Sequence, residues 1–327
     1  MGSEGGNVSF HQNNHWALWN EGIVTKRENG SAQFNPVSGG AGDWGNLYAL
    51  TSFNDTKNNR RVQYGWAPED NNNFAITQQG FQGSLSLPRE LFVHTAEGLL
   101  NTDGQLTITG SSRLTQHQDG TFTAHTLGVR PLEDVVDGLR NGSQELVFAP
   151  CQYTTSTSLQ SSGSKSMELT ATFANVSGQV GLTIGASPNG QEYTNIYFDP
   201  SNNTITVDRA HSSLITEFAN SSVIGYFYPY TTAEGTEPIV MTVFVDGSLI
   251  ELYVNDRFAL TTRIYPSMED STGFGVFFGQ GASAQVNDIA AWMGLQNVFP
   301  GRPLNSSSAL VFDTAVQTNN YTWWPGN

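Results

Sequence analysis

The feature that most constrains the fold is a series of short apolar–polar alternations separated by turn residues. The clearest example runs from 239–245 through Asp246-Gly247 into 249–254. Asp-Gly favours a tight hairpin turn, because that turn needs a residue with positive φ. Residues 167–173 also alternate, which is the period of a half-buried strand. Several such strands from about residue 145 onward predict an antiparallel β-sandwich.

The first half of the chain shows the same pattern in a Gly/Asn-rich background, with weaker alternation. One amphipathic helix is predicted over 131–140, because Pro131 suits a first helical turn and the apolar residues that follow share one face. Short strands are predicted at 16–18, 46–53, 62–66, 83–87, 91–94, 98–100, 106–109 and 121–127.

Charge and composition exclude several classes of protein. Of the 327 residues only 13% are charged, and 14 basic against 29 acidic residues give a net charge of −15. A helical bundle needs more Glu, Lys, Leu and Ala, and a nucleic-acid-binding protein needs a basic stripe. No apolar run reaches 18 residues, so no membrane span is expected. The single cysteine allows no intrachain disulfide.

The expected location rests on two observations that disagree. The start, Met1-Gly-Ser-Glu-Gly-Gly, has neither a basic nor an apolar segment, so no signal peptide is expected. Low charge and nine Asn-x-Ser/Thr sequons are typical of an extracellular protein. The nine asparagines are Asn7, Asn29, Asn54, Asn141, Asn175, Asn202, Asn220, Asn305 and Asn320.

Two patterns superficially suggest a metal, and neither predicts one. His11 and His15 have an i, i+4 spacing, but the Gln-Asn-Asn between them indicates a loop and not a helix. Residues 199–203 resemble a calcium loop without its required Gly and closing Glu. No metal and no cofactor are therefore expected.

Sugar cleavage requires two carboxylates a few ångströms apart, so acidic residues are the next candidates. Glu69 and Asp70 are neighbours, and neighbours on a strand point to opposite faces. Asp43 precedes Trp44-Gly45, where a ring could stack on a sugar while the carboxylate binds its hydroxyls. The alternative, that Trp44 is a core residue, is equally open.

Several segments in the right order resemble glycoside hydrolase family 32, most closely the fungal invertases and fructosyltransferases. The resemblance covers roughly residues 5–304. The segments are Asp43-Trp-Gly-Asn-Leu-Tyr-Ala49, Arg60-Arg-Val-Gln-Tyr-Gly-Trp-Ala-Pro-Glu-Asp70, Gln78-Gln-Gly-Phe-Gln-Gly-Ser-Leu-Ser-Leu-Pro-Arg-Glu-Leu91, Ile205-Thr-Val-Asp-Arg209 and Phe244-Val-Asp-Gly-Ser-Leu-Ile-Glu-Leu-Tyr-Val-Asn255.

This resemblance implies an all-β chain with a remnant of the last blade or blades of a five-bladed β-propeller, followed by an antiparallel β-sandwich. The implied domains are the partial propeller at 1–128, the sandwich at 129–304 and a C-terminal extension at 305–327. The stretch Pro88-Arg89-Glu90 is expected to tie the blade to the sandwich through charge-assisted hydrogen bonds.

The family cleaves or transfers terminal β-fructofuranosyl groups with retention, and its three catalytic carboxylates lie in Asn-Asp-Pro-Asn, Arg-Asp-Pro and Glu-Cys-Pro motifs. None of these motifs occurs in this sequence. The resemblance therefore implies no catalytic residue here and a chain that is inactive alone. It implies sugar contact for Asp43, Trp44 and Tyr48, although only Asn46-Leu47 stand between Gly45 and Tyr48, where the family usually has an acidic residue and an aromatic.

Three functions stay open from the sequence. The first is a C-terminal part of a family 32 protein that acts on sucrose or fructans and is extracellular like the family. The second is a non-catalytic sandwich that binds a carbohydrate or a partner. The third is a chain that pairs with a separate N-terminal propeller half. β-Fructoside sugars are the expected ligands, with no nucleic acid and no membrane.

Overall fold

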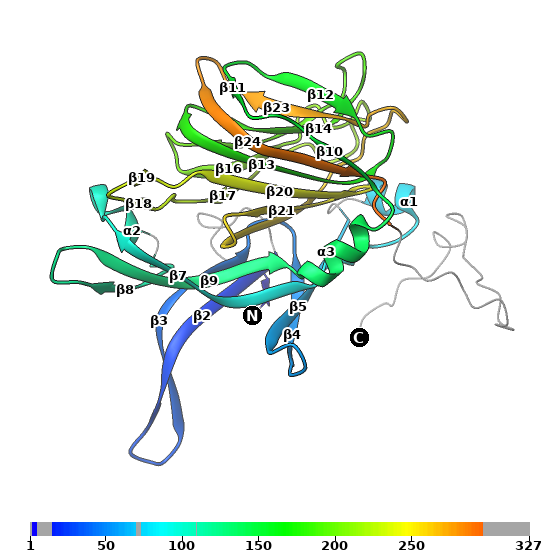
Figure 1. The fold of residues 1–327 in the computed structure, drawn as a ribbon. Helices are drawn as coiled ribbons and strands as arrows, with labels where there is room; N and C mark the ends of the chain where they lie inside the picture. Colours follow the sequence, from blue (N-terminus) through cyan, green and yellow to red (C-terminus); the bar gives the residue numbers. More distant parts are fainter. Residues whose placement is uncertain (1, 5–14, 70–72, 109, 297–327) are drawn as a thin grey trace, which may run out of the picture.

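The structure is a computed structural model that describes residues 2–4, 15–69, 73–108 and 110–296. Almost all of its regular structure is antiparallel β-sheet. Figure 1 shows two parts, a sandwich of two packed sheets and, beneath it, two open sheets built from the earlier residues. The predicted all-β class is confirmed.

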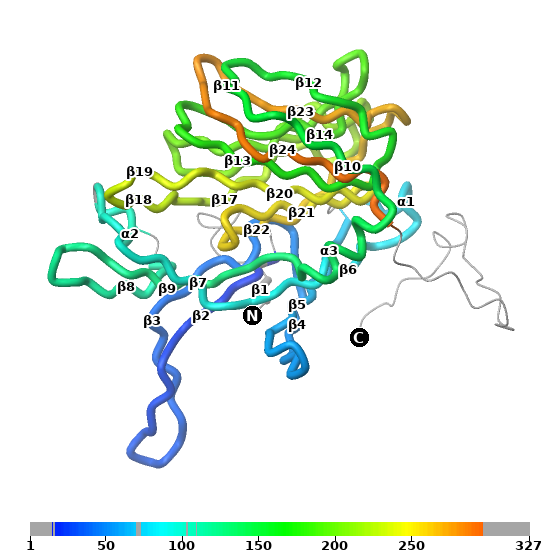
Figure 2. Tube along the Cα trace, viewed as in Figure 1, coloured from blue at the N-terminus to red at the C-terminus, as the bar shows by residue number. Residues whose placement is uncertain are grey.

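The first open sheet contains a long hairpin arm. Its order is β1-β2-β3, with β1 at Gly2–Glu4, β2 at His15–Lys26 and β3 at Ala32–Asp43. Figure 2 shows the tip of this hairpin projecting away from the rest of the chain. Gly30 turns the chain with φ +87, and Ser31 donates its N–H to Asn29 Oδ1 at 3.0 Å. The sequence predicts strand only at 16–18, because Gly, Asn and Pro residues obscure the alternation in the arm.

The second open sheet has the order β4-β5-β7-β9-β8, and β6 pairs with the end of β5. The predicted strands at 62–66 and 91–94 lie within longer strands, and those predicted at 46–53 and 121–127 overlap strands that begin two residues and one residue later. The members are β4 (Tyr48–Asp55), β5 (Arg60–Ala67), β6 (Ser84–Leu85), β7 (Arg89–Leu99), β8 (Arg113–Gln116) and β9 (Phe122–Pro131).

The strand predicted at 106–109 is wrong. A 3-10 turn at Thr102–Gly104 leads into the short helix α2 at Gln105–Ile108. The side-chain oxygen of Asn101 accepts the N–H of Leu106 at 3.1 Å and stabilises this helical turn. Leu106 is thereby buried against Leu99 and Ala124, so a tertiary contact overrides the local alternation.

The predicted amphipathic helix is confirmed as α3, Glu133–Arg140, with Val136 and Leu139 buried. It begins after Leu132, two residues later than predicted, because Pro131 still pairs with Arg89 in the sheet. A second helix, α1 at Asn73–Gln79, is not predicted by the sequence pattern.

The sandwich consists of a seven-stranded sheet and a six-stranded sheet, with a short hairpin beside them. One sheet has the order β10-β24-β13-β20-β21-β22, with β11 on β24, and the other has β12-β23-β14-β15-β16-β17. The bounds are β10 Gln144–Val147, β11 Cys151–Tyr153, β12 Thr157–Ser161, β13 Ser166–Ser177, β14 Val180–Ala186, β15 Thr194–Asp199, β16 Thr204–Asp208, β17 Val223–Tyr226, β18 Thr231–Thr232, β19 Gly235–Thr236, β20 Ile239–Asp246, β21 Leu249–Val254, β22 Phe258–Arg263, β23 Gly273–Phe278 and β24 Ser283–Met293.

The alternation predicted in β13 is confirmed by burial. Met167, Leu169, Ala171 and Phe173 are at most 3% exposed and join one continuous core with the inner faces of the other sandwich strands. The hairpin β20–β21 is also confirmed. Its turn lies at Gly247-Ser248, one residue later than predicted, and Gly247 has φ +58.

The boundary between the two parts lies between β9 and β10. β9 completes the second open sheet at Pro131, α3 follows, and β10 begins the sandwich at Gln144. The division predicted at 128/129 stays a prediction, and the predicted extension at 305–327 lies outside the described residues. In the part of the chain that the structure describes, no helix is long and apolar enough to cross a bilayer.

Candidate functional site

The chain just after β3 binds to the edge of the sandwich as an extra strand. The N–H of Trp44 donates to the Ala259 carbonyl at 2.9 Å, and the N–H of Asn46 donates to the Thr261 carbonyl at 2.7 Å. A Cβ at Gly45 would overlap the carbonyl oxygen of Thr261, so only glycine permits this approach. The segment therefore covers β22, an edge strand that would otherwise expose unpaired backbone groups.

A fully buried ion cluster closes this junction. Asp43 and Arg89 are 0% exposed and Glu251 is 1% exposed. Arg89 donates from Nη1 to Asp43 Oδ2 and from Nη2 to Glu251 Oε2, each at 2.8 Å, and also to Thr261 Oγ1 at 2.6 Å. Asp43 Oδ1 accepts the N–H groups of Gly45 and Thr261 at 2.8 and 3.0 Å. The prediction that Arg89 ties the blade to the sandwich is confirmed.

The electrostatics of the cluster stabilise its charged form. Burial disfavours the charge on Arg89, but the neighbouring carboxylates of Asp43 and Glu251 outweigh it and raise the pKa of the guanidinium. Burial also raises the pKa of Tyr253 well above its usual range, so its hydroxyl stays protonated and donates to Glu251 Oε2 at 2.8 Å. A buried cation with two buried anions is therefore compensated by specific hydrogen bonds.

A second buried ion pair crosses the same junction. Glu69 is 0% exposed, lies 3.1 Å from Arg263 Nη1 and accepts the hydroxyl of Tyr265 at 2.7 Å. Arg263 also donates to the Ala67 carbonyl at 2.6 Å. Glu69 is thus engaged inside the junction, and Asp70 lies outside the described residues.

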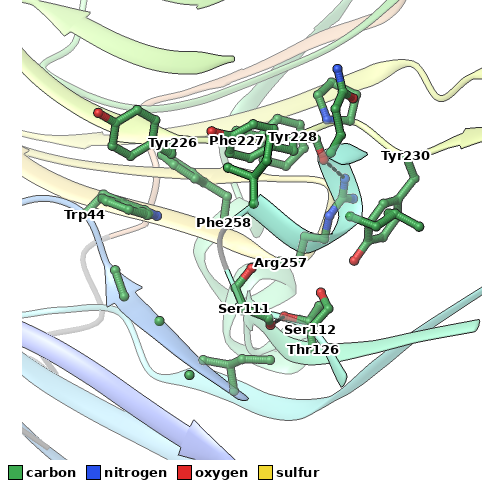
Figure 3. Close-up of a pocket in the computed structure, with 18 of the residues that line it drawn as sticks. Trp44, Ser111, Ser112, Thr126, Tyr226, Phe227, Tyr228, Tyr230, Arg257 and Phe258 are labelled. Atoms are coloured by element: carbon green, nitrogen blue, oxygen red, sulfur yellow. Dashed lines mark hydrogen bonds between the residues drawn. The ribbon is translucent and has the colours of Figure 1, made fainter. Parts of the chain in front are cut away.

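A cavity of about 500 Å³ opens between the arm, the second sheet and the sandwich. Figure 3 shows Tyr226, Phe227 and Tyr228 on one wall and Ser111, Ser112 and Thr126 on the opposite wall. The lining residues are Leu18, Trp19, Gly39, Gly40, Ala41, Trp44, Leu100, Gln105, Leu106, Ile108, Ser111, Ser112, Thr126, Leu127, Tyr226, Phe227, Tyr228, Pro229, Tyr230, Thr231, Arg257 and Phe258.

The aromatic wall is held rigidly from behind. The Trp44 ring meets Tyr226 edge-on at 5.7 Å and stacks parallel to Phe258 at 6.4 Å. A Cβ at Gly225 would collide with both Trp44 and Phe258, so glycine permits these rings to lie against β17. Arg257 lies over the rings of Phe227 and Tyr230, 4.6 and 4.0 Å from their centroids. These contacts fix the ring positions before any ligand binds.

The cavity is poor in acid–base groups. No Asp or Glu stands among its described lining residues, and Arg257 is its one Lys or Arg side chain there. A retaining glycosidase needs two carboxyl groups about 5–5.5 Å apart. In the described segments, no group of three or more His, Cys, Asp or Glu side chains could hold a metal ion. The described lining therefore lacks the pair of carboxyl groups that this chemistry uses.

The structure separates the three residues predicted to contact sugar. Asp43 lies inside the junction with both carboxylate oxygens engaged, Trp44 lines the cavity, and Tyr48 stacks on His15 at 4.4 Å away from it. Their contact with a sugar stays a prediction. His11 lies outside the described residues.

The cavity residues on the sandwich side were missed. The sequence carried one signal for them, the run Tyr226-Phe-Tyr-Pro-Tyr230, in which four of five residues are aromatic. A run of this kind also occurs in ordinary core strands. The other wall, at 39–41, is Gly-Gly-Ala and has no side-chain signature.

Comparisons with known proteins agree with this architecture. The model for the glycosyl hydrolases family 32 N-terminal domain matches residues 11–103, and the model for the family 32 C-terminal domain matches residues 135–293. Among solved structures, a fructosyltransferase from A. japonicus is similar with a TM-score of 0.81 and 28% identity, over 92% of this chain and 53% of that one. An Aspergillus kawachii beta-fructofuranosidase shares the fold with a TM-score of 0.79 and 24% identity, over 90% of this chain and 54% of that one.

The fold therefore defines a protein that joins propeller blades to a β-sandwich, and the predicted architecture is confirmed. The chain belongs to glycoside hydrolase family 32. An insoluble beta-fructofuranosidase isoenzyme of Arabidopsis thaliana is 25% identical over 280 residues, which are 76% of this chain and 44% of that enzyme. The chain thus spans about half the length of these relatives.

Proposed function

We propose that this chain supplies the last propeller sheets and the sandwich of a family 32 protein that acts on β-fructofuranosides such as sucrose and fructans. The similarity to a fructosyltransferase and to plant beta-fructofuranosidases supports this substrate class. Transfer and hydrolysis both start from a fructosyl–enzyme intermediate, so both require a carboxylate nucleophile and an acid.

We also propose that the chain alone does not cleave these sugars. The observation that supports this most is the position of Asp43, the carboxylate beside the cavity tryptophan. Its two oxygens accept hydrogen bonds from Gly45, Thr261 and Arg89, and its side chain has no exposed surface. A nucleophile must reach the anomeric carbon, and a general acid must reach the leaving oxygen.

The test is release of fructose from sucrose and from inulin by the purified chain, with the heat-denatured chain as control. We expect release equal to that of the control over hours. Fructose release that rises in proportion to the concentration of native chain contradicts the proposal. Loss of that release in Asp43→Asn, with the circular dichroism spectrum of the native chain retained, would then assign catalysis to Asp43 itself.

We further propose that the open sheets are completed by the remaining propeller blades, supplied by a longer form of this protein or by a separate polypeptide. Large apolar side chains on these sheets are exposed, among them Ile23, Val24 and Phe34 in the arm and Phe53 on β4. Several large apolar side chains exposed on open sheets are what an uncovered interface would leave. Co-expression with a chain that encodes the three missing motifs should give a soluble complex that hydrolyses sucrose.

An extracellular location is proposed for the product. Six of the nine sequons lie in described residues, and the asparagine of each one is exposed: Asn29, Asn54, Asn141, Asn175, Asn202 and Asn220. Exposure at the surface is what a glycan acceptor requires. Secretion from a eukaryotic host, followed by a mass shift on glycosidase treatment, tests this location.

A further inference from the structure

We propose that the cavity between the arm and the sandwich is a binding site for an uncharged oligosaccharide, which it holds without cleaving. The cavity of about 500 Å³ falls within the usual range of ligand sites, and it combines aromatic walls with a few polar groups as those sites do. The choice of a fructosyl oligosaccharide as ligand rests on the proposed function, whereas the preference for a neutral sugar rests on the cavity itself.

The charge of the cavity selects against an ionic ligand. Arg257 is its one described basic residue, and both of its terminal nitrogens donate to the Glu237 carboxylate. Nη2 also donates to the Tyr228 carbonyl at 3.2 Å. The guanidinium is thus neutralised and held in place, and it offers no free charge to a phosphate or carboxylate.

The shape of the cavity suits a flat ring with one apolar face. Trp44 is half-buried and Tyr226 is 42% exposed, whereas Phe227 and Phe258, which support them, are 4% and 2% exposed. The first two rings therefore present surface to the cavity from a fixed base. Gly39, Gly40 and Ala41 also line the cavity, with backbone and one methyl group.

Three polar side chains in the described lining of the cavity are open to the hydroxyls of a ligand. Within the described part of the chain, no hydrogen-bond partner is present for the Ser112 hydroxyl, the Gln105 amide or the Trp19 indole N–H, and all three line the cavity. A sugar presents hydroxyl groups at its ring edge that can both donate and accept. Aromatic faces on one side and open polar groups on the other match the two kinds of surface on a sugar ring.

The experiment is calorimetric titration of the full chain with short inulin oligosaccharides. Two variants change the cavity in different ways: Trp44→Ala removes a ring, and Ser112→Phe adds volume at a half-buried position that lines the cavity. Phe53→Ala is the matched control, because it removes an aromatic ring that is 51% exposed on the same half of the chain, outside the cavity. Circular dichroism of each variant checks that it folds.

We expect millimolar or tighter binding by the native chain and by Phe53→Ala, and an affinity about tenfold lower or worse in both cavity variants. Absence of binding, or equal binding by all four proteins, overturns the proposal. Tighter binding of a sugar phosphate than of the neutral sugar also overturns it. Equal binding of a glucose oligosaccharide supports the sugar site and overturns only the fructosyl class. Fructose release, measured separately, decides the proposed function independently.

Discussion

The sandwich and the open sheets bury their apolar residues in different ways. The sandwich has one continuous core drawn from its own strands, including the fully buried Phe173, Leu182 and Leu252. The described residues also form four smaller buried apolar clusters. Each of these clusters combines side chains of the sandwich with side chains from the earlier part of the chain. Leu47 and Ala67 pack with Leu249, for example, and Leu99 packs with Tyr230.

This difference indicates that the open sheets depend on the sandwich for their stability more than the sandwich depends on them. The open sheets have no buried apolar cluster of their own in the described residues, so their stability rests on the junction with the sandwich. A sheet needs a hydrophobic face that is covered in order to be stable. We expect the junction to decide whether the sheets fold, while the sandwich folds around its own core.

The largest expected effect comes from breaking the ion cluster with Arg89→Met. This change leaves Asp43 and Glu251 as buried carboxylates without their cation, which costs about 3–5 kcal/mol. Hydrogen exchange should show loss of amide protection in β4, β5, β7 and β9, with protection in β13, β20 and β24 retained. Urea unfolding gives the total change in free energy.

The matched control for this change is Arg130→Met. Arg130 pairs with Glu90 at 2.9 Å, but its side chain is 45% exposed, so the loss should be about 1 kcal/mol or less. Equal destabilisation by both variants, or earlier loss of protection in the sandwich, would show that the two parts unfold as one unit.

An intermediate effect, confined to the sandwich, is expected for Glu192→Gln. Its carboxylate joins three loops by accepting the N–H groups of Leu214, Ser267 and Met268 at 2.8, 2.9 and 3.1 Å. Burial opposes the charged form, but hydrogen bonds from the Ser267 and Ser271 side chains and from backbone N–H groups outweigh it and lower the pKa of Glu192 from 4.5 to about 2.

Because this pKa is lower in the folded state, the carboxylate stabilises the protein fully above pH 4.5, and the effect fades as the pH falls toward 2. We expect Glu192→Gln to cost about 2 kcal/mol at pH 7, with the difference from the native chain shrinking below pH 4.5. Thermal unfolding across pH measures it. Glu234→Gln, at an exposed position, is the control, and a pH-independent loss would refute the assignment.

The smallest effect on stability should come from the arm. Val24 is 67% exposed near the tip of the hairpin, so Val24→Lys should change the free energy of unfolding by about 0.5 kcal/mol or less. A charge on an exposed strand also prevents edge-to-edge association. Light scattering at rising protein concentration should therefore show less association than in the native chain.

Val240→Lys, on the sandwich, adds the same charge at a position that is 37% exposed. If both variants reduce association equally, net charge is the cause and the arm has no special role. If only Val24→Lys reduces association, the native chain associates through its open sheets.

The sequence predicted elements whose cause is local. The alternation of β13 and the Asp-Gly signal before β21 each act over a few residues, and both were located to within a residue or so. The helix at α3 followed from Pro131 and one apolar face. The arm β2–β3 was largely missed, because its Gly-rich strands pack little and so carry little alternation.

The candidate site could be predicted only in part. Trp44 was found because it lies beside Asp43 in a recognisable segment, and it does line the cavity. Asp43 was grouped with it, although the chain turns its carboxylate toward Thr261 and Arg89. These two neighbours in sequence therefore lie in different places: Asp43 in the junction and Trp44 in the cavity wall.

The sequence by itself determined that the chain is all-β, that it belongs with family 32 proteins and that the three catalytic motifs of that family do not occur in it. The fold class, the family resemblance and the absence of the motifs can be read from short segments, because residue spacing and turn-forming residues act over a few positions. Only the tertiary structure decided that Asp43 is a structural anchor and that Trp44 packs edge-on against Tyr226 in the wall of a cavity. Contacts between residues so far apart in the chain depend on how two sheets dock, and docking depends on burial and shape complementarity that no local pattern records.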